Sequence, residues 1–164
     1  MLEEHEYENV FSDQLINVVK DQFNTEYINQ QMNIMISLID SSPTDVIGKA
    51  KELVESCFKH ILDDYGECYN NGDSLSQLRK KVFKKLNLDV KTNISAKNND
   101  DVKKILSSFN TIIDGLSSLR NEKGDGHGKG KHYKELPKRY AELAMNSSLS
   151  LVHFIWETHR DLQN

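Results

Sequence analysis

Proline, glycine and cysteine are all scarce in this sequence. Its 164 residues include two prolines, eight glycines and two cysteines. So few chain-breaking residues favour long helices over many short strands joined by tight turns. The two cysteines, Cys57 and Cys68, form no Cys-x-x-Cys pair and belong to no Cys/His cluster. The sequence therefore indicates neither a zinc site nor a disulfide scaffold.

Long apolar runs are also lacking. No stretch approaches the ~20 apolar residues that a membrane-spanning helix needs. The N-terminus, MLEEHEYE, is acidic, whereas a signal peptide starts with basic residues and then becomes apolar. We therefore expect a cytoplasmic protein with no membrane partner. A length of 164 residues suits one domain with a single main core.

Positive charge is in the minority, but it is concentrated. The net charge is −4, which taken alone argues against nucleic acid as a partner. Between Arg120 and Arg139, however, seven Lys or Arg residues stand against three acidic ones, so this segment carries +4 and the rest of the chain −8. An acidic body with one basic segment fits a localised anion site, and it fits a solvated lysine-rich loop equally well.

Apolar residues recur at steps of three and four along most of the chain, which predicts amphipathic helices. The first forty residues are expected to form one or two of them, with an apolar face that includes Tyr27, Ile28, Met32, Met35, Ile36 and Ile39. A break at 41–45 follows, and Thr44 or Asp45 is expected to cap the next helix. Its apolar face runs from Ile47 to Tyr65, and Gly66 should end it.

Three further helices are expected. A short one begins at a cap formed by Ser74 or Asp73 and reaches Leu86, and the asparagine-rich residues 87–100 then form a loop. A long helix covers residues 102–119.

The final helix should have Pro137 in its first turn. Its expected apolar face consists of Tyr140, Leu143, Ala144, Ser147, Leu151, Ile155 and Trp156. His60 and His159 are expected on polar helix faces. Together these patterns predict an all-α bundle of five to six helices. We divide it into an N-terminal helical segment (1–43) and a helical domain (44–164) that form one compact unit.

One short segment, LRNEKGDGHGKGKH at 119–132, contains half of the glycines. It is no Walker-type phosphate loop, because no glycine stands five residues before either Gly-Lys pair and a helix precedes it. A metal site built from Asp125, His127 and His132 is a weak pattern, since the spacing places no third strong ligand. Glycines that end a helix and carry a surface loop are a further interpretation, although one glycine would suffice for that.

A fourth interpretation joins Arg120, Asn121 and His127 into one unit. An arginine at a helix end can hold a phosphate through two hydrogen bonds. A histidine titrates near neutral pH and can exchange a proton with a ribose hydroxyl. These are the groups that metal-free RNA cleavage needs, in which the 2′-hydroxyl attacks the neighbouring phosphodiester.

Three blocks of sequence carry a resemblance to a known family. They are IGKAKELVES (47–56), LRNEKGDGHGKG (119–130) and RYAELAMNSSLSLVHFIWET (139–158). In this order they resemble the abortive-infection C-terminal domain family, which is similar to the HEPN superfamily. The mark of that superfamily is an arginine, usually a polar residue after it, and a histidine four to six residues further on. Arg120, Asn121 and His127 match this pattern with six intervening residues.

The resemblance implies a helical bundle that forms a homodimer and brings two Arg/His pairs into one cleft. Many HEPN proteins are metal-independent endoribonucleases that act as toxins or in phage defence. For this chain the resemblance implies an RNA substrate, an antitoxin or other defence protein as a partner, and no metal or cofactor. Arg120, Asn121 and His127 would be the catalytic residues.

Other residues have two open interpretations each. Lys123, Lys129 and Lys131 either contact the RNA backbone or belong to a solvated loop. Lys51 and Glu52 either support the site from the facing helix or form an ordinary polar helix face. The function itself has an alternative: a non-catalytic RNA- or nucleotide-binding dimerisation module of a defence or toxin–antitoxin system.

Overall fold

The structure, a computed structural model, describes residues 2–88, 100–123, 128 and 130–164. For residues 2–12, 102, 103, 106, 117 and 120–123 it describes the backbone alone. Within this part of the chain there are six α-helices and no strands, which confirms the all-α prediction. The helices are α1 (Leu2–Phe23), α2 (Glu26–Leu38), α3 (Pro43–Asp64), α4 (Leu75–Lys85), α5 (Asp100–Lys123) and α6 (Lys138–Gln163).

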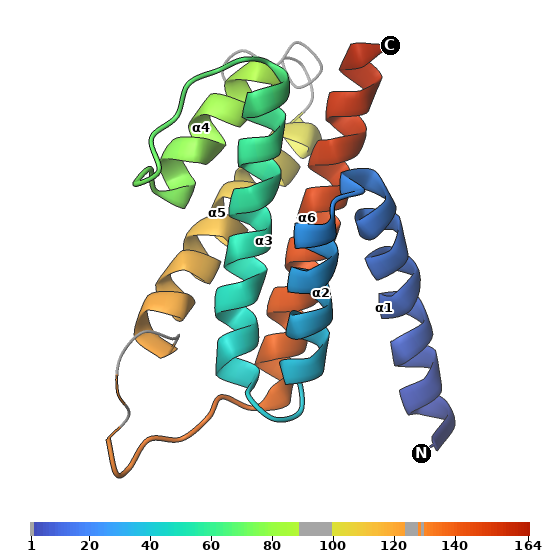
Figure 1. Ribbon diagram of the computed structural model, residues 1–164, viewed down its shortest axis with the longest axis vertical. Coiled ribbons are helices and arrows are strands. Elements are labelled where there is room, and N and C mark those ends of the chain that lie inside the picture. The colour runs from blue at the N-terminus through green and yellow to red at the C-terminus, as the bar shows by residue number, and fades with distance from the viewer. Residues whose placement is uncertain (1, 89–99, 124–127, 129) are drawn as a thin grey trace.

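Helix α3 is the centre of the bundle. It packs against α2, α4, α5 and α6, while α1 packs against α2 and α6 on one flank (Figure 1). Its apolar side chains are almost all buried, and they join those of the other five helices in one continuous core. The largest fully buried side chains include Phe58, Ile61 and Leu62 of α3, Met32 and Met35 of α2, and Leu149 and Leu151 of α6.

The C-terminal end of α3 follows the sequence prediction. Gly66 adopts a left-handed backbone with a φ of 66°, which a residue with a side chain would rarely adopt. Its N–H donates to the Asp63 carbonyl at 3.0 Å, and the Glu67 N–H reaches back to the Leu62 carbonyl at 2.9 Å. These bonds satisfy carbonyls that the helix end leaves open.

The N-terminal end of α3 differs from the prediction. The helix begins at Pro43, so Ser42 holds the cap position, and neither Thr44 nor Asp45 does. Proline suits the first helical position because it has no N–H to leave unpaired. Pro137, in contrast, stands at the cap position of α6, one residue before its first turn.

Two other helix starts are capped by side chains. Ser74 caps α4, as the sequence indicated, and Gln77 completes a capping box with it. Thr25 caps α2 by accepting the Ile28 N–H at 3.3 Å. The chain turns between α1 and α2 at Asn24, which has a φ of 47°, so the first forty residues form two helices. Residues 89–99 of the expected loop lie outside the described residues.

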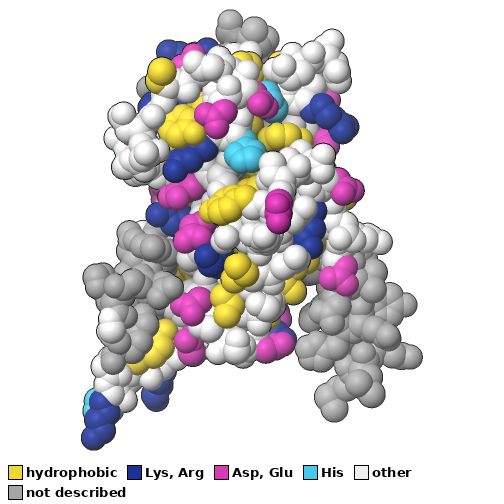
Figure 2. All heavy atoms as spheres, viewed as in Figure 1, with side chains coloured by type: hydrophobic (Ala, Val, Ile, Leu, Met, Phe, Trp, Pro, Cys, Tyr) yellow, Lys and Arg dark blue, Asp and Glu magenta, His cyan; other side chains and the backbone are white. Residues whose placement is uncertain are grey.

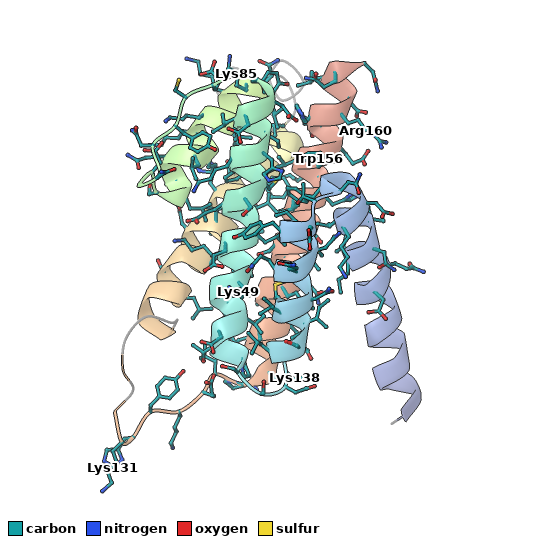
Figure 3. The ribbon with its side chains drawn as sticks, viewed as in Figure 1. Lys49, Lys85, Lys131, Lys138, Trp156 and Arg160 are labelled. Carbon is teal, nitrogen blue, oxygen red and sulfur yellow. The ribbon has the colours of Figure 1, made fainter. Side chains whose placement is uncertain are left out.

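No helix in the described part of the chain is both long and apolar enough to cross a membrane. The visible face in Figure 2 mixes acidic and basic side chains over most of the bundle. Basic side chains gather at the lower tip, where Figure 3 labels Lys131.

Candidate functional site

Three of the residues expected to form the site lie where α5 ends. Arg120, Asn121 and Lys123 occupy the last turn of α5, and for these three the structure describes the backbone alone. His127 and Lys129 lie outside the described residues. The start of α3 and the start of α6 lie at the same end of the bundle (Figure 1). A cation in the last turn of a helix is stabilised by the partial negative charge of the unpaired carbonyls there.

The chain that returns to α6 projects away from the helices. Gly130 begins a turn in which its carbonyl accepts the Tyr133 N–H at 3.1 Å. Lys131 and His132 are both exposed within that turn. Figure 3 shows Lys131 at the tip of the segment, pointing away from the bundle. Its ammonium is therefore accessible to an anion as large as a nucleic acid.

The next residues of the chain are tied to the start of α3. Thr44 is only 1% exposed, and its hydroxyl donates to the Glu135 carboxylate. The same carboxylate oxygen accepts the Thr44 N–H at 3.0 Å. The Thr44 hydroxyl oxygen in turn accepts the Tyr133 hydroxyl at 3.0 Å and the Leu136 N–H at 3.4 Å. Glu135 therefore acts as the side-chain cap that α3 lacks locally, and its negative charge suits a helix N-terminus.

A second link holds the start of α6. The Lys138 Nζ lies 2.7 Å from an Asp40 oxygen in the α2–α3 connection and 3.7 Å from a Glu142 oxygen (Figure 3). The hydrogen bond to the Asp40 carboxylate raises the pKa of Lys138 above its usual value. The Lys138 ammonium thus links the start of α6 to the α2–α3 connection, and its charge is already paired with two carboxylates.

A family model described as an HEPN-like domain, Abi_C, matches residues 26–159. The chain belongs to this family. The match runs from α2 to the last turns of α6 and includes Arg120, Asn121 and His127. It confirms the resemblance that the three sequence blocks indicated. Neither the curated proteins nor the solved structures include a significant match.

Lys51 and Glu52 lie on different sides of α3 in this Abi_C domain. Glu52 is 3.2 Å from Lys49, whose Nζ also donates to Gln31 of α2, so Glu52 belongs to the α2 side. Lys51 pairs instead with Glu55 at 3.2 Å, and both side chains are partly buried. Two residues along a helix correspond to about 200°, so Lys51 is turned away from the side on which Lys49 meets α2. Lys51 and Glu52 therefore make their contacts on different sides of α3.

The opposite end of the Abi_C domain contains a buried histidine that the sequence pattern missed. His159 was expected on a polar face, but it is 5% exposed, and its Nε2 lies 3.0 Å from an Asp64 oxygen. Its ring packs edge-on against Tyr65 and Trp156, with centroids 5.2 and 5.6 Å away. A histidine beside a carboxylate resembles a general base, yet only 5% of His159 is exposed. We assign His159 to packing.

The Cys57 thiol lies in the buried core. Burial raises the pKa of the Cys57 thiol far above its usual value, so this cysteine is no nucleophile. Among the described residues, no three His, Cys, Asp or Glu side chains gather in a way that could hold a metal ion.

Proposed function

We propose that the protein is a metal-independent endoribonuclease of a defence system, with Arg120, Asn121 and His127 as its catalytic residues. One observation carries this proposal: the Arg-x6-His pattern begins in the last turn of the long helix α5, within a domain of an HEPN-like family. The basic segment that follows it, including the exposed Lys131, supplies attraction for a polyanion.

The reaction proposed is attack by a ribose 2′-oxygen on the adjacent phosphorus. One imidazole takes the 2′-hydroxyl proton, and a second imidazole, already protonated, gives a proton to the departing 5′-oxygen. The products are a 2′,3′-cyclic phosphate and a 5′-hydroxyl. The Arg120 guanidinium stabilises the negative charge that grows on the phosphoryl oxygens. Asn121 orients the phosphate or a side chain of the partner.

Two imidazoles at one phosphate call for two copies of the chain. A base at the 2′-oxygen and an acid at the 5′-oxygen stand on different sides of the phosphorus, so a single His127 cannot serve both. We therefore propose that the active form is a homodimer with two-fold symmetry. Each copy contributes one Arg120 and one His127.

The α5–α6 face is the surface proposed for this dimer. Four large apolar side chains are exposed on it: Ile105 of α5 and Tyr140, Leu143 and Phe154 of α6. Phe109 and Phe154 stack across the two helices with centroids 5.0 Å apart. Exposed apolar side chains gathered on neighbouring helices are typical of a protein–protein interface.

The register of α5 links this face to the site. Arg120 stands eleven residues after Phe109, and eleven residues make about three full helical turns. Its backbone position is therefore on the same side of α5 as Phe109. A two-fold axis near the α5–α6 face would bring the last turns of two α5 helices toward each other, as the composite site requires.

Product analysis tests the proposal. The purified protein should cut single-stranded RNA and leave 2′,3′-cyclic phosphate ends, and it should not cut DNA of the same sequence, because DNA has no 2′-hydroxyl. Cleavage of both nucleic acids at equal rates would refute the mechanism. RNA binding without cleavage would instead favour the non-catalytic module.

A further inference from the structure

The Thr44 hydroxyl uses all of its hydrogen-bonding capacity on one short segment. A hydroxyl has one proton to donate and two lone pairs that accept. Thr44 donates to Glu135 and accepts from Tyr133 and Leu136, three residues within four consecutive positions. A polar group this deeply buried is costly unless it is hydrogen-bonded. The hydroxyl therefore serves to hold residues 133–136 against the start of α3.

The residues after Glu135 are also held against the bundle. Leu136 packs against the central apolar cluster, and Lys138, the first residue of α6, forms an ion pair with Asp40. The far side of the glycine segment is thereby fixed by hydrogen bonds, apolar contact and an ion pair. Its near side is fixed by α5, which ends at Lys123.

Six residues separate Lys123 from Gly130, and His127 is one of them. Seven residue steps can span at most ~25 Å, since each extends the chain by no more than ~3.6 Å. A segment of this length with both ends held explores far less space than one held at a single end. Without the Thr44 contacts, the far side would be held only from Leu136 onwards, by the apolar contact of Leu136 and the Lys138–Asp40 ion pair.

We propose that Thr44 and Glu135 are positioning residues of the ribonuclease site, which act by anchoring the return of the glycine segment to the N-terminus of α3. The inference rests on the proposed function. Neither residue touches RNA in this account. Their contribution is to place the imidazole, and a displacement of about 1 Å at a reacting group can cost ~10²-fold in rate.

The test uses Thr44→Val, which keeps the branched shape and removes the hydroxyl, and Thr44→Ser, which keeps the hydroxyl. Glu135→Ala removes the other partner from an exposed position, so it cannot empty the core. Thr158→Val is the matched control, because its hydroxyl donates only to the Phe154 carbonyl in its own helix, at 2.9 Å. Amide hydrogen exchange of residues 130–136 and the kcat and KM for RNA are measured on each folded variant.

Thr44→Val and Glu135→Ala should speed amide hydrogen exchange in residues 130–136. They should lower kcat about 10- to 100-fold with little change in KM. Thr44→Ser and Thr158→Val should behave as the wild type. Unchanged exchange in Thr44→Val would refute the anchor, and faster exchange with an unchanged kcat would refute its positioning role. A wild type that cuts no RNA would refute the ribonuclease and the positioning role together, while the exchange result would still decide whether the anchor exists.

Discussion

Thr44 and Glu135 stand 91 residues apart in the sequence, yet both the N–H and the hydroxyl of Thr44 donate to the same carboxylate oxygen of Glu135. This contact joins the first turn of the central helix to the segment that follows the glycine-rich stretch. The end of α5 and the start of α6 lie at the same end of the bundle as this contact (Figure 1). Arg120 and Asn121 lie at this end, in the last turn of α5.

Substitution of Arg120 separates catalysis from structure. Arg120→Ala should lower the cleavage rate about 10²–10³-fold, as loss of one transition-state donor does, and should weaken RNA binding. Arg120→Lys keeps the charge without the planar fork and should recover little of the rate. Cleavage, RNA affinity and melting temperature are measured together.

The control for Arg120 is Arg160→Ala. Arg160 is exposed near the other end of α6 and pairs with Glu157 at 3.2 Å (Figure 3). Its removal should leave cleavage unchanged. A large fall in melting temperature for Arg120→Ala would show that this arginine is a structural cap, and the ribonuclease proposal would lose its main support.

The proposed dimer predicts that a charge on the α5–α6 face abolishes both assembly and activity. Leu143 is 64% exposed, and Leu143→Glu would bury a carboxylate in the interface. Burial of an unpaired charge costs several kcal/mol, which raises the dissociation constant about 10²-fold or more. Light scattering should therefore give a dimer for the wild type and a monomer for the variant.

Ile34→Glu is the matched control for Leu143→Glu. Ile34 lies on α2 and is 41% exposed, so a charge placed there can reach solvent in a single copy. The Ile34→Glu variant should remain dimeric and active. A wild type that is monomeric at micromolar concentration, or a dimer that Leu143→Glu leaves intact, would contradict the proposed interface.

The ion pair beside α4 predicts a pH dependence of stability. The Lys81 ammonium, 2.8 Å from the Asp73 carboxylate, and the Asn70 N–H lower the pKa of Asp73 below its usual value. A folded pKa below the unfolded one stabilises the protein at neutral pH, and this contribution is lost as the pH falls. Asp73→Asn should therefore melt below the wild type at pH 7.

The difference between Asp73→Asn and the wild type should shrink below the ordinary Asp pKa of about 3.9. Lys81→Met should reproduce the pattern, because it removes the main cause of the lowered pKa. The melting temperatures of the wild type and the two variants, measured from pH 7 to acidic pH, check this dependence. A difference that is constant over the whole range would show that the pair contributes through packing alone.

The buried histidine of α6 should matter for stability and not for catalysis. His159→Ala removes a ring packed between Tyr65 and Trp156 and should lower the free energy of unfolding by about 2 kcal/mol or more. The remaining folded protein should cut RNA at the wild-type rate. Loss of cleavage by a folded His159→Ala variant would contradict the assignment of His159 to packing.

Local signals predicted much of the fold. Ser74 and Gly66 sit at helix ends because their own chemistry suits those positions, and each acts on residues within a few positions of itself. The long apolar repeats gave α3 and α6 because burial on one face needs only helical spacing. The family blocks, also local, led to Arg120, Asn121 and His127.

Long-range contacts could not be predicted in the same way. Thr44 was expected to cap α3, but Pro43 starts the helix earlier and the Thr44 hydroxyl is bonded to a distant segment. His159 looked polar because a single apolar face was assumed for α6. In the bundle α6 packs on α1 and on α3, so more of its circumference is buried. Glu135 and Asp64, the hydrogen-bond partners of Thr44 and His159, are each about 90 residues or more away, so the nearby sequence could not indicate them.

The most direct measurement of the central claim is RNA cleavage in excess EDTA by the wild type, His127→Ala and His132→Ala. His132 is an exposed histidine five residues further along the same segment, so it controls for loss of an imidazole there. The wild type and His132→Ala should cut RNA at equal rates in EDTA. His127→Ala should bind RNA and cut it ~10²–10⁴-fold more slowly, as loss of a positioned acid–base group does. Abolition of wild-type activity by EDTA, or full activity in His127→Ala, would contradict the account.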